Sequence, residues 1–247
     1  MKIFITGNMG LLGTGFTKYF GDKYEIVGFD HKSGDEVLDY SSLTKKMQGC
    51  EMAVHLAAIP KPLMGKTFDD YIQNNVLTTK NVLESATMNG LKRVIFASST
   101  SIYGIEKGIP FASPIKENNA FVSEYLTWDS LKCRDIDLSY HMSKVMAEQI
   151  LAWYGLSKKI ETIALRFGPI NKVFLGTSVS MENATSAIDL ALRSKNEYWY
   201  EPFSIVDDLP HISNEKAKRM LNFSPKDPNY QSDQIHSTFE ERAILEN

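Results

Sequence analysis

Short apolar segments alternate with longer segments of helical periodicity along most of the chain. The apolar segments are rich in β-branched and aromatic side chains, which is typical of buried strands. Strands that alternate with helices form a parallel sheet that is covered on both faces. The alternation therefore predicts an α/β fold with a doubly wound parallel Rossmann sheet and a small C-terminal substrate-binding segment. The expected strands are 2–6, 25–30, 53–56, 93–97, 161–166 and 199–206.

Helical periodicity separates these strands, and the expected helices are a stretch ending near residue 20 and the segments 41–47, 69–88, 138–154, 181–193 and 213–221. Ser41 is the expected cap of the 41–47 helix, and Gly155 is the expected end of the 138–154 helix. The segment 104–136 contains prolines and asparagines and is expected to be a loop that partly covers a site. We expect a dinucleotide-binding Rossmann domain over residues 1–168, and a small substrate-binding segment over residues 169–247 that completes the same unit.

The charge balance and the cysteines limit the class of partner. Lys and Arg total 27 and Asp and Glu total 30, so no electrostatic footprint for nucleic acid is expected. No apolar run approaches the ~20 residues that span a bilayer, and no secretory signal is expected because the first strand begins at Lys2. Cys50 and Cys133 form neither a disulfide framework nor a metal site. A cytoplasmic protein with a small-molecule substrate is therefore expected, without a metal, a nucleic acid or a membrane as partner.

A glycine-rich turn follows the first strand, where Thr6 to Gly13 reads TGNMGLLG. Gly7, Gly10 and Gly13 are spaced three apart between a strand and a helix. Glycines at these positions let backbone N–H groups approach a pyrophosphate closely, and the helix N-terminus favours its negative charge. The turn therefore predicts a dinucleotide site.

Asp30 ends the second expected strand about 20 residues after the turn, where a carboxylate accepts the two ribose hydroxyls of a dinucleotide. The same carboxylate repels a 2′-phosphate, so NAD is favoured over NADP. His31 and Lys32 are neighbouring cations and weaken that preference.

Tyr140 and Lys144 lie in the sequence YHMSK within an expected helix. Residues four apart share one helix face, so the ammonium of Lys144 can stabilise the phenolate of Tyr140 and lower its pKa. Such a tyrosine can take a proton from an alcohol or give one to a carbonyl. The strand that ends at ASSTSIYG supplies hydroxyl groups at the edge where open α/β sheets bind ligands, and Ser99 is among them.

Taken together, these motifs resemble the NAD-dependent epimerase/dehydratase family of the extended short-chain dehydrogenase/reductase superfamily. The resemblance covers approximately residues 1–170. It is carried by TGNMGLLG, Asp30, LDY at 38–40, HLAA at 55–58, NNV at 74–76, SSTSIYG at 98–104, YHMSK at 140–144 and LRFGP at 165–169.

The resemblance implies roles for the matching residues. It implies that Tyr140 is the acid/base, that Lys144 tunes it and binds the nicotinamide ribose, and that Ser99 is the catalytic hydroxyl. It also implies that Asp39 meets the adenine amino group. The implied cofactor-binding residues are Gly7, Gly10, Leu12, Gly13, Asp30, Asp39, Tyr40, Leu56, Ala57, Ala58, Asn75, Tyr140, Lys144, Gly168 and Pro169.

Departures from the family pattern bear on the reaction. Family members that dehydrate nucleotide sugars carry an Asp-Glu pair where Thr100 and Ser101 stand here, so a dehydratase is disfavoured. The short segment after Lys144 is similar in size and layout to uronate dehydrogenases, which oxidise a free sugar acid. Such an enzyme needs an arginine for the substrate carboxylate, and Arg166 and Arg193 are the candidates.

The sequence therefore predicts an NAD-dependent oxidoreductase that transfers hydride at a secondary alcohol or carbonyl of a sugar or sugar derivative. The substrate is expected to be a sugar, a sugar acid or a nucleotide sugar. Two alternatives stay open, namely a nucleotide-sugar 4-epimerase with tightly bound NAD and a dinucleotide-binding sensor or regulatory protein without turnover. The resemblance further implies a homodimer formed through the 69–88 helix and the helix that carries Tyr140.

Overall fold

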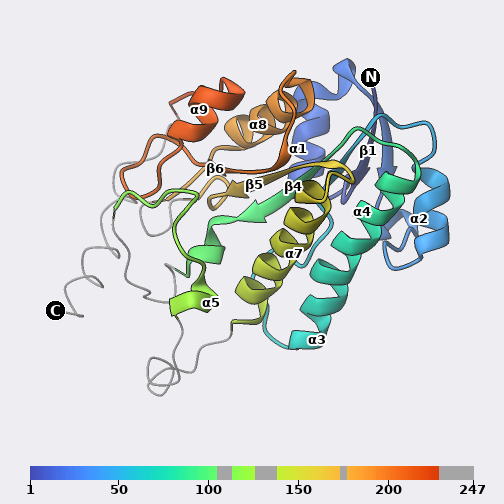
Figure 1. Ribbon diagram of the computed structural model, residues 1–247, viewed down its shortest axis with the longest axis horizontal. Helices are drawn as coiled ribbons and strands as arrows, with labels where there is room; N and C mark the ends of the chain where they lie inside the picture. The colour runs from blue at the N-terminus through green and yellow to red at the C-terminus, as the bar shows by residue number, and fades with distance from the viewer. Residues whose placement is uncertain (105–112, 126–137, 173–176, 228–247) are drawn as a thin grey trace.

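A computed structural model describes residues 1–104, 113–125, 138–172 and 177–227. A parallel sheet of six strands runs through its centre in the order β2-β1-β3-β4-β5-β6 (Figure 1). The expected doubly wound Rossmann fold is confirmed. The strands are β1 (Lys2–Thr6), β2 (Glu25–Phe29), β3 (Met52–His55), β4 (Arg93–Ser99), β5 (Glu161–Phe167) and β6 (Trp199–Ile205).

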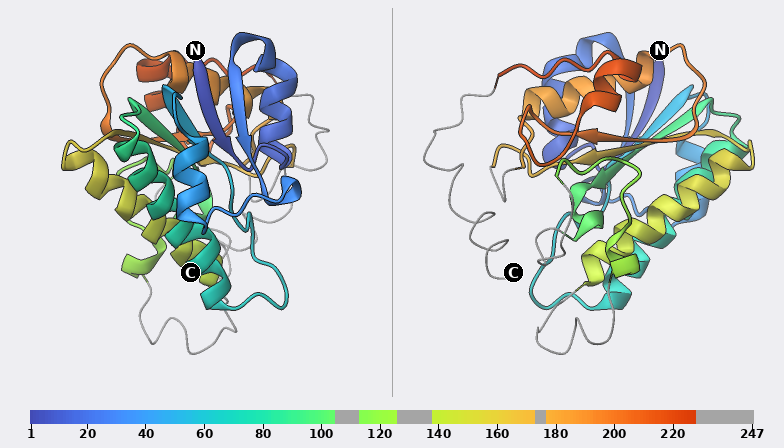
Figure 2. Two further views of the ribbon diagram at one scale, coloured as in Figure 1. Left: turned by 90° about the vertical axis from the view of Figure 1, so that its right-hand side faces the viewer. Right: turned by 60° about the vertical axis from the view of Figure 1, so that its left-hand side comes forward.

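Helices cover both faces of the sheet, with α1, α8 and α9 on one face and α2, α4 and α7 on the other (Figures 1 and 2). The helices are α1 (Leu11–Phe20), α2 (Tyr40–Lys46), α3 (Phe68–Tyr71), α4 (Thr78–Met88), α5 (Val122–Tyr125), α7 (Ser139–Leu156), α8 (Met181–Arg193) and α9 (Glu215–Leu221). Short 3-10 turns are η1 (Gly21–Lys23), η2 (His31–Ser33) and η4 (Thr100–Tyr103), and η3 (Ile72–Leu77) is a π-helical segment.

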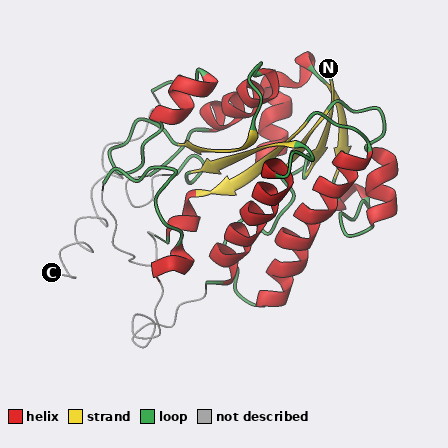
Figure 3. Cartoon of the chain, viewed as in Figure 1, coloured by secondary structure: helices red, strands yellow, loops and turns green. Residues whose placement is uncertain are grey.

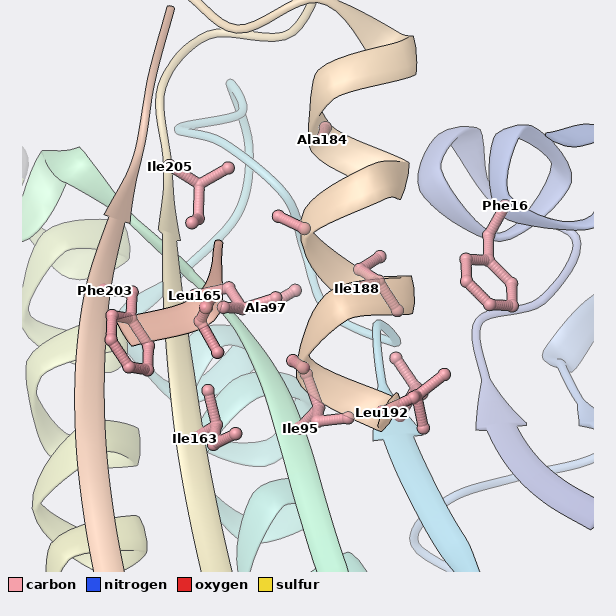
Figure 4. Packing of buried hydrophobic residues seen from close by; sticks show 14 of the residues in the cluster. Phe16, Ile95, Ala97, Ile163, Leu165, Ala184, Ile188, Leu192, Phe203 and Ile205 are labelled. Carbon is pink, nitrogen blue, oxygen red and sulfur yellow. The ribbon is translucent and has the colours of Figure 1, made fainter. Parts of the chain in front are cut away.

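Alternation of side chains along each strand fills two hydrophobic cores, one on each face of the sheet. In β4, Ile95 and Ala97 pack toward α8, while Val94 and Phe96 pack toward α4 and α7. Figure 4 shows the first of these cores, where Phe16 of α1 lies beside the α8 side chains. Because successive strand residues point to opposite faces, a parallel sheet covered twice needs apolar residues at nearly every position.

The long helix expected over 69–88 is present as α3, η3 and α4 in succession, with a π-helical segment in its middle. Thr67 and Asp70 form a capping box at its start. Gly90 follows its end at φ +68°, a conformation that favours glycine. The inserted turn places Asn75 on the buried side of the helix.

The predicted cap of the 41–47 helix and the predicted end of the 138–154 helix differ from the structure. Asp39, and not Ser41, caps α2, because its side chain accepts the Ser42 N–H. Helix α7 does not end at Gly155 but continues through it to Leu156. A Cβ on Gly155 would lie 2.7 Å from the backbone N of Tyr200, so this glycine allows α7 to approach β6 closely.

The expected covering loop at 104–136 falls largely outside the described residues. The described part of the loop, 113–125, contains α5, and Ile115 bridges to Ile212 near the end of the sheet. None of the described helices is both long and apolar enough to cross a membrane.

Candidate active site

The carboxyl ends of all six parallel strands lie at one edge of the sheet, which the arrowheads in Figure 3 mark. The chain order of the strands reverses about β1, which pairs with β2 on one side and β3 on the other. Ligands of open α/β sheets bind at this kind of topological switch point. The glycine turn, Asp30, the loop after β3 and Ser99 all follow strands at this edge.

Packing alone accounts for two glycines of the turn. Gly7 has φ +71°, and a Cβ there would lie 2.7 Å from the backbone N of Ala57. A Cβ on Gly13 would lie 2.5 Å from the Cα of Asn8. These glycines therefore hold the β1 turn against the β3 loop and against the start of α1.

Gly10 is different, because its backbone conformation does not require a glycine. Its φ of −80° suits any residue, and a Cβ would meet only the Gly7 carbonyl oxygen, at 3.1 Å. Helix α1 starts at this point without a side-chain cap and without an acidic residue in its first turn. The uncapped N–H groups fit the pyrophosphate of a dinucleotide.

Asp30 is buried and held rigidly beside this turn, with 3% of its surface exposed. One carboxylate oxygen accepts the Met9 N–H at 2.9 Å, and the other accepts the Lys32 N–H at 2.9 Å. Lys32 also reaches back across the turn, where its Nζ donates to the Met9 carbonyl at 3.0 Å. Each carboxylate oxygen keeps acceptor capacity, so the group fits the two hydroxyls of a ribose.

Asp39, Tyr40 and Leu12 each make contacts within the protein that do not involve a cofactor. Asp39 is exposed and caps α2, while the Tyr40 hydroxyl donates to the Met88 sulfur at 2.7 Å. Leu12 is half-buried and packs on the hydrophobic core under the turn. Their roles toward a cofactor stay predictions.

The loop after β3, with Leu56 to Ala58 half-buried, is fixed by a chain of buried polar side chains. The Ala57 N–H donates to the Thr6 hydroxyl at 3.3 Å, and that hydroxyl lies 2.7 Å from Nδ1 of His55. Nε2 of His55 lies 3.2 Å from the Thr79 hydroxyl. Burial lowers the pKa of His55 to about 3, so this ring is neutral and links β1, β3 and α4.

Asn75 connects the loop after β3 to helix α7. Its side-chain oxygen accepts the Ile59 N–H at 2.8 Å, and its Nδ2 donates to the Ser143 hydroxyl at 2.9 Å. Ser143 in turn donates to the Tyr140 carbonyl at 2.7 Å. The π-helical turn that carries Asn75 therefore positions the helix turn that bears Tyr140, as such turns often do near functional sites.

Tyr140 and Lys144 lie on the same face of α7, four residues apart and both buried, with 5% and 4% of their surfaces exposed. The Tyr140 ring packs edge-on against Tyr71 at a centroid distance of 6.3 Å. The Lys144 Nζ donates to the Ala97 carbonyl at 2.9 Å and lies 4.9 Å from the centre of the Phe96 ring. Burial lowers the pKa of Lys144 to about 8, so the ammonium persists at neutral pH.

Ser99 ends β4 and is half-buried. Its hydroxyl accepts the Ser101 N–H at 3.1 Å and donates to the Ser101 hydroxyl at 3.0 Å. Ser99 therefore caps η4 and keeps one lone pair for a further donor. Ser99 lies close to the N-terminal part of α7. The Lys144 Nζ on this part of the helix bonds to the carbonyl of Ala97, two residues before Ser99 in β4.

Gly168 and Pro169 follow β5 and are held by backbone contacts. The Gly168 N–H donates to the Ile205 carbonyl at 3.1 Å, and the Pro169 carbonyl accepts the Val179 N–H at 3.0 Å. A Cβ on Gly168 would lie 3.1 Å from both the Ser178 carbonyl carbon and the Val206 side chain. Packing explains this glycine without a ligand.

Neither arginine expected at a substrate carboxylate is available for it. Arg166 is 1% exposed, and its guanidinium binds the carboxylate of Glu148, with Nη2 2.7 Å from Oε2. Arg193 ends α8 at the opposite edge of the sheet, where Nε donates to Asp189 at 2.8 Å. The expectation is wrong for both residues. The Arg166 guanidinium is paired with Glu148 inside the protein, and Arg193 lies at the edge of the sheet opposite the glycine turn.

Glu148 was not singled out from the sequence, although its position one helical turn after Lys144 places it on the face of α7 that carries the acid/base pair. Its full burial has no local signal, because the partners Ser98, Arg166 and Tyr200 come from three different strands.

The fold and the glycine turn define a dinucleotide-binding Rossmann protein. The family model described as "NAD dependent epimerase/dehydratase family" matches residues 3–170, and the chain belongs to this family. The family description names NAD, which agrees with the expected cofactor.

Individual proteins that the chain is similar to include sugar-converting dehydrogenases and an epimerase. The chain is 22% identical over 197 residues to a uronate dehydrogenase of Pseudomonas syringae pv. tomato, covering 78% of this chain and 65% of that protein. It is 25% identical over 174 residues to an L-arabinose 1-dehydrogenase (NAD(P)(+)) of Haloferax volcanii, covering 68% of this chain and 66% of that protein. The crystal structure of UDP-glucuronic acid 4-epimerase from Bacillus cereus in complex with NAD has TM-score 0.76 and 19% identity, with full coverage of both chains. The chain thus spans slightly less than two thirds of the length of these two dehydrogenases.

Proposed function

We propose that this protein is an NAD-dependent oxidoreductase that acts on a secondary alcohol or carbonyl of a sugar or sugar derivative. The observation that carries the proposal is the buried pair of Tyr140 and Lys144, placed on one face of α7 beside the end of β4. A buried lysine whose pKa lies near 8 is rare outside functional sites, because burial of an ammonium is unfavourable. The pair lies toward the same edge of the sheet as the uncapped glycine turn and Asp30, which supports a redox site.

In this proposal each residue of the chain has one task. The Tyr140 hydroxyl takes a proton from the substrate alcohol or returns it to the carbonyl. The Lys144 ammonium stabilises the phenolate, and the Ser99 hydroxyl orients the substrate oxygen. Bound NAD supplies the hydride acceptor or donor. Gly10, the N-terminus of α1 and Asp30 would hold its pyrophosphate and ribose.

A sugar dehydrogenase is the reaction we favour. Two relatives that match most of the chain are sugar dehydrogenases by name, and Thr100 and Ser101 replace the acidic pair that nucleotide-sugar dehydratases carry. Because Arg166 and Arg193 are paired elsewhere, a free sugar or a sugar derivative fits better than a sugar acid held by either arginine. A 4-epimerase, which would regenerate NAD in each turnover, is the second candidate, and the shared fold supports it.

The test is an absorbance assay at 340 nm with NAD and a panel of L-arabinose, D-glucose, D-glucuronate, UDP-glucose and UDP-glucuronic acid. The proposal expects NADH to accumulate with one of the free sugars or the sugar acid. Interconversion of a UDP-sugar without a change at 340 nm would favour the epimerase. Binding of NAD without turnover of any compound would favour the sensor.

We further propose a cytoplasmic homodimer in which residues 1–168 form the NAD-binding part and 169–247 complete the substrate side. Exposed apolar side chains on the outer helices support the dimer, since Trp153 of α7 is 56% exposed and Leu77 beside α4 is 43% exposed. Buried, unpaired Cys50 is compatible with a reducing compartment. Light scattering on the protein and on Trp153→Glu tests the assembly, with a dimer expected for the first and a monomer for the second.

A further inference from the structure

A fully buried carboxylate lies one helical turn after Lys144 on the face of α7 that carries Tyr140. Glu148 has 0% of its surface exposed. Arg166 of β5 donates from Nε to Oε1 at 3.0 Å and from Nη2 to Oε2 at 2.7 Å. Ser98 of β4 also donates to Oε1, and the Tyr200 hydroxyl of β6 donates to Oε2 at 3.1 Å. Three neighbouring strands thus converge on one carboxylate of the helix.

The backbone is strained to complete this set. Tyr200 has φ +90°, which is unfavourable for an aromatic residue. It occupies a bulge in β6, where the register jumps so that Thr162 pairs with Trp199 and Ile163 pairs with Glu201. A bulge re-aims a side chain, and here it turns the Tyr200 hydroxyl onto Glu148. Strain of this kind persists where the surroundings fix it, and it often marks a functional site.

Stability does not explain a buried ion pair at this place. Desolvation of both charges offsets their attraction, and apolar replacements of such pairs are often as stable. The chain has a comparable pair, Arg93 and Glu161, at the amino edge of the sheet. Both arginines also have a structural task, because Arg93 donates to the Ala191 carbonyl at the end of α8, and Arg166 donates to the Glu117 carbonyl at 2.9 Å. What sets the pair of Arg166 and Glu148 apart is the position of Glu148 one helical turn after Lys144.

Glu148 is linked to Lys144 in two ways. Ser98, which donates to Glu148, directly follows Ala97, whose carbonyl accepts the Lys144 ammonium at 2.9 Å. The negative charge of Glu148 also raises the pKa of Lys144 against the effect of burial. The carboxylate thus acts on both the acceptor and the charge of the lysine.

Among the described residues, four other titratable side chains around this pair do not supply the effect. His55 is neutral at physiological pH, and Arg166 carries a positive charge that opposes the ammonium. Burial raises the pKa of the Tyr103 and Tyr200 hydroxyls, so both stay protonated.

We propose that Glu148, held by Ser98, Arg166 and Tyr200, is the positioning residue for Lys144, fixing its acceptor and keeping its side chain in the ammonium form. The role rests on the proposed function, in which that ammonium serves Tyr140. Glu148 itself is buried behind Lys144 and touches neither substrate nor cofactor in this scheme.

The direct test is the ionisation of Lys144 in Glu148→Gln, without substrate or NAD. The Cε resonance is followed by NMR in protein labelled with 13C-lysine and is assigned with Lys144→Met. The wild-type midpoint is expected near pH 8, and Glu148→Gln is expected to lower the proton affinity of Lys144 by tenfold or more. Glu161→Gln, which breaks the distant pair, is the matched control and should leave the midpoint unchanged. Glu148→Asp keeps the negative charge and should bring the Lys144 midpoint part of the way back to the wild-type value.

An unchanged Lys144 midpoint in folded Glu148→Gln would overturn the proposal. If that variant does not fold, Glu148→Gln combined with Arg166→Met removes both charges at similar volume and is compared with Arg166→Met alone, so that the two proteins differ only in the Glu148 charge. The Lys144 midpoint should be lower in the double variant, and equal midpoints in the two variants would overturn the proposal.

A second readout separates this role from the proposed function. Because the reaction needs the ammonium, the alkaline limb of the turnover profile should move to lower pH in Glu148→Gln, with kcat lowered and KM retained. Glu161→Gln should keep the wild-type profile. A shifted Lys144 midpoint in a protein without turnover would support the positioning of Lys144 and refute the oxidoreductase. Turnover with an unmoved alkaline limb would refute the positioning role alone.

Discussion

Replacement of Lys144 by methionine is expected to stabilise the folded protein while it removes activity. The Lys144 ammonium is buried, and burial lowers its pKa from 10.5 to about 8. That difference corresponds to about 3 kcal/mol by which the folded state disfavours the charged lysine. Lys144→Met keeps a similar side-chain volume and removes the charge. It also removes the hydrogen bond to Ala97, which contributes about 1 kcal/mol. The expected net gain at pH 7 is therefore about 2 kcal/mol in the free energy of unfolding.

The gain should depend on pH in a defined direction. Between about pH 8 and 10.5 the unfolded chain still holds the proton on Lys144 that the folded protein has lost. The wild type therefore gains stability as the pH rises through this window, whereas Lys144→Met does not. The advantage of the variant should shrink from about 2 kcal/mol at pH 7 to less than about 0.5 kcal/mol at pH 9.5.

Urea unfolding followed by tryptophan fluorescence measures both values. The wild type and Lys144→Met are compared at pH 7 and at pH 9.5, with equal m-values required for the comparison. A variant that is less stable than the wild type at pH 7, or a difference that does not change with pH, would refute the reasoning.

Two further predictions concern the cofactor site. Gly10→Ala should change the free energy of unfolding by less than about 1 kcal/mol, since φ −80° suits alanine and its Cβ meets one backbone oxygen, at 3.1 Å. It should weaken NAD binding more than tenfold, since the Cβ stands where a pyrophosphate would bind. Gly7→Ala is the contrast and should lose at least about 2 kcal/mol because of φ +71° and the contact with Ala57; equal effects of the two variants on stability would contradict this distinction. Asp30→Asn should weaken NAD binding by about tenfold and reduce the preference for NAD over NADP, measured as the ratio of the two dissociation constants. An unchanged ratio would argue against the Asp30 carboxylate as the group that selects NAD.

The elements of the fold could be predicted from the sequence because their signals are local. Strand β1 and helix α8 have the expected bounds, since alternating apolar residues and helical periodicity are short-range patterns. Gly155 shows the limit of this reasoning. A glycine near a helix end commonly terminates it, but here the glycine continues the helix because Tyr200, far along the chain, packs against it.

The candidate site was predictable where residue type and spacing carry the chemistry. The spacing of Tyr140 and Lys144 gives their common face, and the glycine turn gives its place after β1. The pairing of Arg166 could not be predicted, because burial and pairing depend on tertiary contacts. Its partner Glu148 comes from another element, and no local pattern distinguishes a buried guanidinium from one that faces a substrate.

The most direct test of the account compares turnover and NAD binding of Tyr140→Phe in the same preparation. If the phenol of Tyr140 moves the proton, turnover should fall by at least about 100-fold while the dissociation constant for NAD stays within about twofold of the wild type. Turnover that survives the loss of this hydroxyl within about threefold would contradict the assignment of Tyr140 as the acid/base.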